Sequence, residues 1–303
     1  MKKLLERPEH QLYKIISWCN KSDDWSVILN GTAYFKNMLG VEVFGSNVHD
    51  AWLVQQFENY SFDGSQVVDK FIPRPHVSAV FHFKQRPHFV DEVSFILDPF
   101  FLAPIIPKAF TLKFSGDIDT LVVTCKATVF SRLFILDLSP VPKRSIHLPY
   151  PVFHPLWQKM ASLKNNQERM NCFSEFINSI QSTPYVPDAV DLFYTKILEK
   201  SVTVPLKDII RECYVSKSTL IRKFVTRTGV SPKTLARIVR LNYAWHKIVN
   251  ENRVDYQDLV FYGNYFDQSH FINDFKSIVG ETPGHFFQRD LNTVKIFSGK
   301  SYK

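Results

Sequence analysis

Apolar and polar residues alternate with a period of two in several short segments of the first 150 residues. Every second residue from Val77 to Phe83 is apolar, and the same alternation recurs in Phe110–Ser115. Gly116 and Asp117 then supply a turn before the apolar run Leu121–Val123. A period of two is that of a β-strand, and turn residues between two such runs delimit the strands. The pattern predicts a β-rich N-terminal region.

The period changes to that of a helix between His154 and Gln181. Apolar residues there recur at Leu156, Met160, Leu163, Met170, Phe173, Ile177 and Ile180. Such a stripe predicts a helical segment that packs against the β-rich region, with a dimer seam as the alternative. Two prolines within residues 182–187 interrupt the segment and indicate a linker.

After the linker the pattern is helical throughout, and capping residues delimit the helices. We expect these helices at about 206–212, 217–228, 232–250, 256–262, 268–279 and 283–289. Ser231 and Thr282 each precede a proline, which suits an N-cap hydroxyl before a proline at the first helical position. Ser216 and Asp267 are the expected N-caps of the helices at 217–228 and 268–279.

These two helices belong to a repeat whose copies lie 51 residues apart. The matched pairs are Ser218 with Ser269, Leu220 with Phe271, Phe224 with Phe275, Gly229 with Gly280, and Ser231-Pro232 with Thr282-Pro283. Each copy has a short helix, a turn, a capped second helix and a glycine stop, which is the order of a helix-turn-helix. We expect Leu220 and Phe224 to face the core of the first copy with Ile209, and Phe271 and Phe275 to do so in the second.

The segment DQSHFINDFKSIVGETP (Asp267–Pro283) resembles the signature of the AraC family of bacterial transcriptional regulators. SKSTLIRKFVTRTGVSP (Ser216–Pro232) resembles the first helix-turn-helix of that family. The resemblance implies an α+β multidomain protein with a β-rich regulatory domain and an all-α domain of two helix-turn-helix subdomains joined by a long helix. The expected domains are 1–183, for effector binding or dimerisation and ending in a helix, 188–291, for DNA binding, and a basic tail at 292–303.

The resemblance also implies which side chains reach DNA, with the second helix of each copy lying in a major groove. The expected base contacts are Ser218, Ile221, Arg222, Gln268, Ser269, Ile272 and Asn273, and the expected phosphate contacts are Lys217, Lys223, Arg227 and Lys276. Arg222 can donate two hydrogen bonds to guanine, whereas glutamine and asparagine suit adenine. Asn273 stands where many members of the family carry an arginine.

The charge distribution agrees with a nucleic-acid partner. The chain carries a net charge of +8, of which +6 falls in residues 188–303 and +2 in residues 1–187. Between Glu212 and Glu251 there are eight basic residues and no acidic residue. A sequence window in which all charged residues are positive is typical of a surface that binds a polyanion. The prediction is a sequence-specific DNA-binding transcription regulator, with activation favoured over repression by the habit of the family.

The remaining signals indicate a soluble cytoplasmic protein that associates with the nucleoid through DNA. The four cysteines (Cys19, Cys125, Cys172 and Cys213) lie far apart, which favours free thiols in a reducing compartment. The N-terminus lacks the apolar run of a signal peptide, and no apolar stretch is long enough to span a membrane. The expected partner is double-stranded DNA, with RNA polymerase, a small-molecule effector at the N-terminal domain and a second copy of the chain as further candidates, and no membrane.

No enzymatic chemistry is expected from the sequence. His76, His82, His88 and Glu92 suggest a metal site, but a flat strand would hold His76 and His82 roughly 20 Å apart. We therefore expect no catalytic residue, no metal and no cofactor. Two alternatives to a regulator stay open, a DNA repair or modification enzyme built on the same DNA-binding fold and a helical protein-interaction module.

The N-terminal region resembles the β-rich domains of some AraC-type regulators only loosely, through Ile72–Lys84, the strands near 110–123 and Val129–Ser139. Aromatic residues of its strands, such as Phe81, Phe83, Phe100 and Phe101, suit either a hydrophobic core or the lining of an apolar ligand pocket. The sequence assigns no ligand-binding residue.

Overall fold

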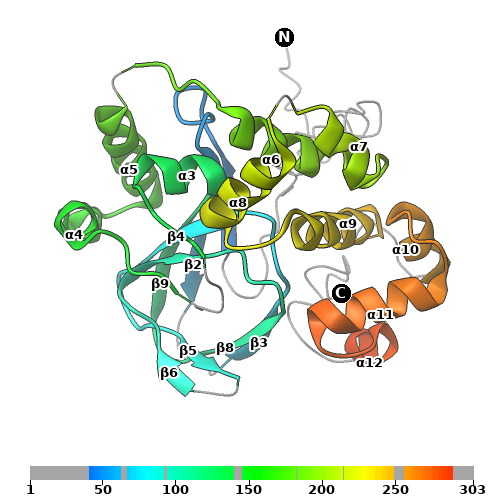
Figure 1. Ribbon diagram of the computed structural model, residues 1–303. Helices are drawn as coiled ribbons and strands as arrows, with labels where there is room; N and C mark the ends of the chain where they lie inside the picture. Colours follow the sequence, from blue (N-terminus) through cyan, green and yellow to red (C-terminus); the bar gives the residue numbers. More distant parts are fainter. Residues whose placement is uncertain are drawn as a thin grey trace, which may run out of the picture.

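The structure is a computed structural model that describes residues 41–62, 67–91, 94–139, 145–181, 183–213, 215–248 and 256–288. Figure 1 shows a β-rich N-terminal region with helices packed beside it and a second group of helices formed by the C-terminal region. The expected class, a β-rich N-terminal region followed by a helical C-terminal region, is confirmed. The basic tail expected at 292–303 lies outside the described residues.

Two antiparallel sheets make up the N-terminal region. The five-stranded sheet has the order β1 (Val41–Gly45), β2 (Val54–Phe62), β9 (Ile118–Cys125), β4 (Val77–His82) and β7 (Phe100–Ala103). The four-stranded sheet has the order β3 (Val67–Phe71), β8 (Phe110–Phe114), β5 (His88–Val90) and β6 (Ser94–Ile96). Apolar side chains of both sheets share one cluster, so the sheets face each other.

The turn at Gly116 joins β8 to β9, as the sequence predicts, and Gly116 has a φ of +75°. A positive φ is accessible to glycine without steric cost, which explains glycine at this position. The two strands do not pair with each other, because β8 pairs with β3 and β5 while β9 pairs with β2 and β4. The turn therefore carries the chain from one sheet to the other.

Both faces of β4 are buried, although alternation of apolar and polar residues is typical of a strand with one exposed face. Val77, Ala79 and Phe81 are fully buried against the helices on the outer face of the five-stranded sheet. His82, three per cent exposed, points with the even-numbered residues toward the space between the sheets. The positions that are polar in the pattern thus face the interior of the N-terminal region rather than solvent.

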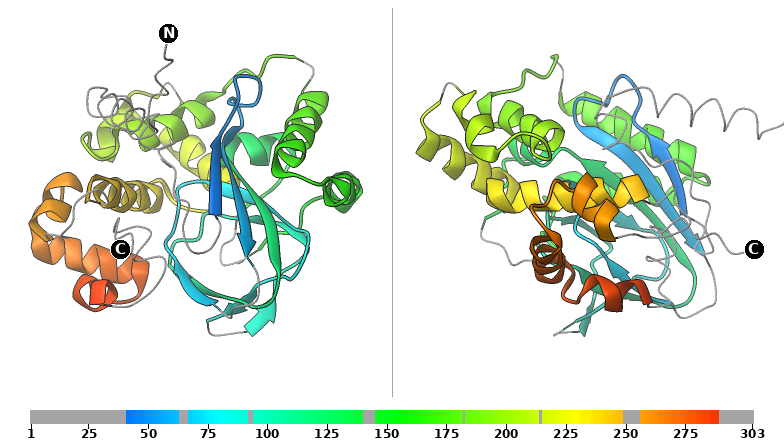
Figure 2. Two further views of the ribbon diagram at one scale, coloured as in Figure 1. Left: turned by 180° about the vertical axis from the view of Figure 1, so that it is seen from behind. Right: turned by 90° about the vertical axis from the view of Figure 1, so that its right-hand side faces the viewer.

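Three helices, α3 (Ala127–Leu133), α4 (Tyr150–Ser162) and α5 (Asn166–Ile180), cover the outer face of this sheet (Figures 1 and 2). The expected helical stripe packs against the sheet, where Phe173 lies 6.0 Å from Phe81 between ring centroids. Helix α3 lies within the region that the sequence predicts to be β-rich, and the pattern does not indicate this helix. The β-branched Thr128 and Val129 favour a strand locally, but packing between the sheet and the C-terminal helices overrides that preference.

The C-terminal helices lie close to their predicted ranges. They are α6 (Ala189–Lys200), α7 (Leu206–Arg211), α8 (Lys217–Thr228), α9 (Pro232–Ile248), α10 (Tyr256–Tyr262), α11 (Gln268–Val279) and α12 (Pro283–Gln288). Helix α9 contacts α6, α7 and α8 on one side and α10 and α11 on the other, so it connects the two helical subdomains (Figure 2). None of the described helices is long and apolar enough to cross a membrane.

The buried apolar residues form one large cluster that crosses from the sheet into the C-terminal region. It runs from Phe81 through Phe130 and Phe193 to Phe224 of α8. A second cluster centres on α10, α11 and α12, with Phe271 and Phe275 at its middle. The first helical subdomain therefore shares its core with the N-terminal region, whereas the second subdomain has a core largely of its own.

Candidate nucleic-acid interface and internal pocket

Helix α8 buries one face and exposes the other. Ile209, Leu220 and Phe224 are fully buried, as the sequence predicts, and the ring of Phe224 lies 5.3 Å from that of Phe193. On the opposite side Lys217, Ser218, Arg222 and Lys223 are exposed, and Ile221 is half-buried. Arg222 makes no hydrogen bond or ion pair within the described part of the chain, so its guanidinium is available to an external acceptor.

Helix α11 repeats this arrangement. Phe271 and Phe275 are fully buried and pack edge to face with ring centroids 5.7 Å apart. The expected DNA-facing residues lie on the other side, where Gln268, Ser269, Asn273 and Lys276 are exposed and Ile272 is half-buried. The inward pairs of both copies are confirmed, and the outward residues are accessible.

The ends of the two helices also follow the repeat. Asp267 accepts a hydrogen bond from the backbone N–H of His270 at 2.7 Å, and α8 and α11 end at Gly229 and Gly280 with φ of +75° and +86°. Ser216 occupies the N-cap of α8 but makes no cap hydrogen bond, because its hydroxyl donates to Thr219 Oγ1 at 2.9 Å. A side-chain cap thus fixes the start of α11, and a glycine stop fixes the end of both helices.

The basic window in the sequence is only partly available as free positive charge. Lys217, Arg222, Lys223 and Lys233 are exposed. Arg227 and Arg237 form ion pairs with Asp188 and Asp274, and the guanidinium of Arg240 lies 5.2 Å from the ring centroid of Tyr265. The basic window contains no acidic residue, but acidic residues elsewhere in the sequence neutralise some of its positive charges.

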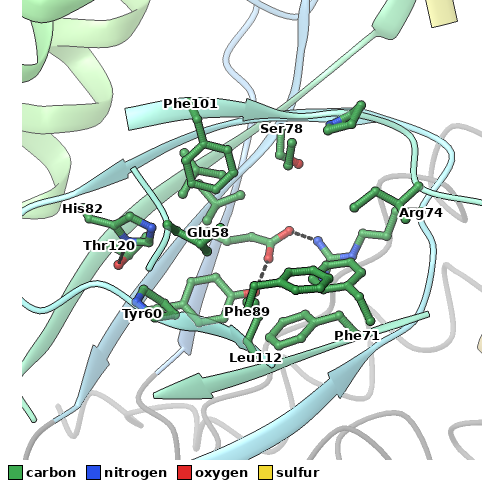
Figure 3. Close-up of a pocket in the computed structure, with 18 of the residues that line it drawn as sticks. Glu58, Tyr60, Phe71, Arg74, Ser78, His82, Phe89, Phe101, Leu112 and Thr120 are labelled. Carbon is green, nitrogen blue, oxygen red and sulfur yellow. Dashed lines mark hydrogen bonds and ion pairs between the residues drawn. The ribbon is translucent and has the colours of Figure 1, made fainter. Parts of the chain in front are cut away.

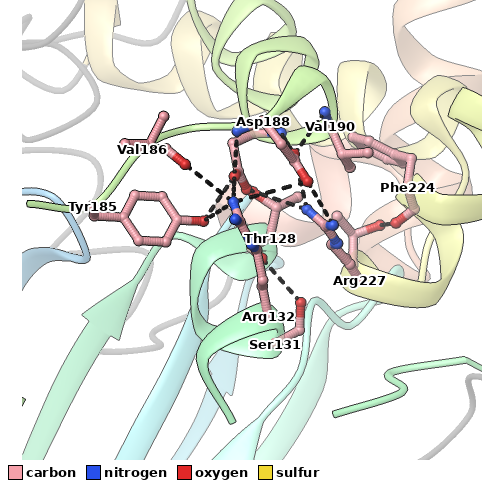
Figure 4. Close-up of polar contacts among 11 residues, drawn as sticks. Thr128, Ser131, Arg132, Tyr185, Val186, Asp188, Val190, Phe224 and Arg227 are labelled. Atoms are coloured by element: carbon pink, nitrogen blue, oxygen red, sulfur yellow. Dashed lines mark hydrogen bonds and ion pairs between the residues drawn. The ribbon is translucent and has the colours of Figure 1, made fainter. Parts of the chain in front are cut away.

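Arg227, an expected phosphate contact, is held by a carboxylate in this structure. Its Nη1 and Nη2 donate to Oδ1 and Oδ2 of Asp188 at 3.0 Å and 2.7 Å (Figure 4). A phosphate would have to compete with Asp188 for these two donors or use the remaining N–H groups of the guanidinium. The other expected phosphate contacts, Lys217, Lys223 and Lys276, are exposed.

The Asp188–Arg227 pair belongs to a polar cluster that joins three parts of the chain. Arg132 of α3 donates to Asp191 Oδ2 at 3.3 Å and to the carbonyl oxygen of Val186 at 3.1 Å, and Tyr185 donates to Asp191 Oδ2 at 2.7 Å. Burial alone would raise the pKa of Asp188, but the hydrogen bonds and the charge of Arg227 lower it to about 2. The carboxylate is therefore ionised at neutral pH and connects the linker to α8.

A pocket of about 150 Å³ lies between the two sheets of the N-terminal region (Figure 3). Five phenylalanines contribute to its wall, namely Phe71, Phe89, Phe101, Phe110 and Phe114. Phe71 and Phe110 stack with ring centroids 5.5 Å apart, and Phe89 stacks on Phe110 at 5.8 Å. Of the four aromatic residues considered from the sequence, Phe101 lines the pocket, whereas Phe81 and Phe100 belong to the core on the helix side and Phe83 packs against that core.

A charged pair lies inside this apolar pocket. Arg74 donates from Nη1 to Glu58 Oε1, while Gln56 and Tyr60 donate to the same carboxylate at 2.6 Å and 2.7 Å. Figure 3 shows the guanidinium reaching toward Glu58 from the rim of the pocket. Burial alone would raise the pKa of Glu58, but the Arg74 charge and these hydrogen bonds hold it below its ordinary value. The pair is therefore ionised.

Two histidines of the pocket lining are neutral and incompletely paired. Burial, aided by nearby positive charges, lowers the pKa of His76 and of His82 to about 3. The Nδ1 of His76 lies 3.0 Å from the Tyr194 hydroxyl, which itself donates to the Pro75 carbonyl oxygen at 2.6 Å. His76 must therefore donate from Nδ1, which leaves its buried Nε2 as an acceptor without a partner in the structure. The Nε2 of His82 is likewise buried without a partner.

These histidines do not form a metal site with the residues around them. Among the described residues, no three His, Cys, Asp or Glu side chains lie together as a metal ion would require. Glu92, the fourth residue of that sequence window, lies outside the described residues. The sequence pattern puts the histidines on one face of a strand, but only the second sheet opposite that face shows that they line a pocket.

The wall of the pocket also touches the C-terminal helices. Lys70, beside the wall residue Phe71, forms an ion pair with Glu281 at 2.6 Å. The Asn242 side chain of α9 donates to the Pro73 carbonyl oxygen at 2.9 Å, and the Ala109 N–H donates to the Ile278 carbonyl oxygen at 2.7 Å. Sequence patterns do not report such contacts, because their partners lie more than 160 residues apart.

Comparison with known proteins supports the interpretation of the helical region. Residues 209–289 match the family described as a helix-turn-helix domain. No curated protein sequence matches the chain. The 1.65 Å structure of ToxT from Vibrio cholerae is 15% identical with a TM-score of 0.42, and covers 77% of this chain and 97% of that chain. ToxT with a bound unsaturated fatty acid is 15% identical with a TM-score of 0.43, covering 82% and 97%. The AraC-like transcriptional activator CuxR is 9% identical with a TM-score of 0.17, covering 78% and 80%.

Proposed function

We propose, on the premise that residues 209–289 form an AraC-type helix-turn-helix domain, that this protein regulates transcription by reading two successive major grooves with α8 and α11. The observation that carries the proposal is the repeated, capped helix with a buried aromatic face and an exposed polar face. A helix of this kind can present its N-terminal residues to base edges while its subdomain core holds it in place.

The exposed residues divide by chemistry into base contacts and phosphate contacts. We assign base contacts to Ser218, Ile221 and Arg222 of α8 and to Gln268, Ser269, Ile272 and Asn273 of α11. Lys217, Lys223 and Lys276 are assigned to phosphates, which set affinity and its salt dependence but carry no sequence information. Arg227 is assigned to a phosphate as well, and there Asp188 competes with DNA for its guanidinium.

The N-terminal region is proposed to bind a small-molecule effector between its sheets and to transmit its presence to the second helical subdomain. Support comes from contacts at or next to the pocket wall. The wall residue Pro73 contacts α9, and Lys70 and Ala109, which are adjacent to wall residues, contact the second helical subdomain. A ligand that displaces Phe71 or Phe110 would disturb the residues next to them, which hold α11 and α12. The resemblance to the AraC family favours activation over repression, with RNA polymerase and a second copy of the chain as the proposed partners.

The first test selects bound sequences from random duplex DNA with the full chain and then measures the salt dependence of the selected site. Each phosphate contact should contribute about −0.9 to the slope of log K against log salt. Enrichment of a motif with two half-sites about one helical turn apart supports the proposal. Failure to enrich any sequence refutes it.

A matched pair of variants then tests the assignment of Arg222. Arg222→Ala should weaken binding to the selected site by about 1–3 kcal/mol and relax the preference at one base position, because a bidentate contact to guanine is lost. Lys159→Ala removes one exposed positive charge from α4 and serves as the control. Equal affinities of the two variants in a gel-shift titration would exclude Arg222 from the interface.

A further inference from the structure

The pocket between the sheets combines an apolar wall with a net charge of zero. Glu58 and Arg74 are the only pocket-lining residues that are charged at neutral pH, because His76 and His82 are neutral. The Glu58 carboxylate is almost completely buried, whereas the Arg74 side chain is 36% exposed. The positive charge in the pocket is therefore already neutralised by a partner that cannot leave for solvent.

Arg74 still has hydrogen-bonding capacity for a ligand. Its guanidinium donates from Nη1 to Glu58 and also forms a hydrogen bond with the Tyr60 side chain. A guanidinium carries five N–H donors, so the remaining ones can meet an acceptor on a molecule inside the pocket. A neutral acceptor such as a carbonyl oxygen would take such a bond without adding charge.

A ligand with a carboxylate in place of the carbonyl group would interact less favourably with the same pocket. It would place a second negative charge beside Glu58 in a site walled by phenylalanine rings, and two carboxylates that share a buried site repel each other. The Nε2 of His76 and the Glu58 carboxylate are both acceptors, so neither can donate a hydrogen bond to an anion, and the spare N–H donors of Arg74 are open to either ligand. The charge pattern thus discriminates between two ligands of the same shape.

We infer that this pocket takes a neutral, mostly apolar molecule bearing a carbonyl group, such as a small aryl ketone, and discriminates against the corresponding carboxylate. The inference rests on the proposed role of the N-terminal region as the effector-binding part of the regulator. An apolar cavity of about 150 Å³ holds a molecule of the size of benzene. The stacked rings of Phe71, Phe89 and Phe110 suit a flat partner.

The test compares two probes that differ in charge but hardly in shape, acetophenone and benzoate. Both are titrated into the full chain at pH 7 by isothermal titration calorimetry. Acetophenone should bind at least tenfold more tightly than benzoate. Ala103→Leu, which narrows the pocket, should weaken acetophenone binding and so locate the site. Equal or tighter binding of benzoate, or no binding of either probe, would overturn the inference.

A substitution that changes only the charge of the pocket should reverse the preference. Glu58→Gln keeps the volume of the side chain and an acceptor for Arg74, but leaves the guanidinium without a counter-ion. Benzoate should then bind at least tenfold more tightly than acetophenone. If the variant unfolds at the same thermal midpoint as the native protein and still prefers acetophenone to benzoate, the inference is contradicted. If this variant does not fold, Arg74→Gln replaces it and should weaken acetophenone binding, and unaltered binding there contradicts the inference equally.

Operator binding is measured on the same preparations, which separates this inference from the proposed function. A protein that binds its selected DNA but neither probe remains a regulator and loses only the ligand assignment. A protein that shows the predicted probe preference but enriches no DNA sequence keeps the pocket assignment and loses the proposed function.

Discussion

The ion pair between Asp188 and Arg227 joins the linker to α8, and its contribution to stability can be worked out. In the folded protein the pKa of Asp188 is about 2, whereas its ordinary value is 3.8. At about 1.4 kcal/mol for each pH unit this difference corresponds to about 2.5 kcal/mol. The Asp188 side chain is 35% exposed, so solvent screening reduces the expected value to about 1 kcal/mol.

The informative substitution is Asp188→Asn, because asparagine is as good an N-cap as aspartate and the cap of α6 is kept. The free energy of unfolding at pH 7 should fall by about 1 kcal/mol in urea denaturation. A carboxylate whose pKa is lowered by folding stabilises the protein above the unfolded-state pKa. The difference between native protein and variant should therefore be constant above pH 4, shrink as the pH falls from about 4 to about 2, and vanish below.

A double-mutant cycle with Arg227→Gln separates this pair from its neighbours. The coupling energy should account for most of the loss in the single variant, since both guanidinium nitrogens bind Asp188. A loss that persists unchanged at pH 2, or a coupling energy near zero, would show that the pair is not the source of the low pKa of Asp188.

Two further predictions concern the cores and the helix ends. Phe224→Ala should cost about 3–5 kcal/mol and lower together the midpoints followed by near-ultraviolet and by far-ultraviolet circular dichroism, because Phe224 lies in the core shared with the sheet. If the midpoints from the two spectral regions differed, the shared core would not unfold as one cooperative unit. Gly280→Ala should cost about 1–2 kcal/mol in urea denaturation, because its φ of +86° strains a side chain. Gly45→Ala, where an added Cβ meets no atom within 4 Å, is the matched control, and equal effects would contradict the strain.

The positions of α8 and α11 could be predicted because their signals are local. Asp267, Gly229 and Gly280 fix helix ends through backbone geometry within one turn, and Leu220 and Phe224 mark the buried face by spacing alone. Local signals of this kind survive whatever the rest of the chain does. Which exposed residues touch DNA stays a prediction, because exposure alone does not distinguish a base contact from a solvated side chain.

The features that could not be predicted depend on contacts between distant segments. Thr128 and Val129 suit a strand, and only packing against the sheet and α8 makes their segment helical. His82 looks like a surface residue in an alternating strand until a second sheet covers that face. The basic window around Arg227 reads as free charge, although Asp188, 39 residues away, neutralises one of its members. Periodicity reports which face a residue occupies, but not what lies opposite that face.

The unequal division of the cores constrains how such a protein can change during evolution. Recombination at the linker would transfer Phe224 without the sheet-side residues that complete its core, so the transferred first subdomain would arrive incomplete. The second subdomain carries most of its own core and could be exchanged as a unit. If α8 and α11 read DNA as proposed, new operator preferences at the first half-site are expected to arise through substitutions on the outer face of α8. Preferences at the second half-site can arise either through substitutions or through replacement of the whole second subdomain.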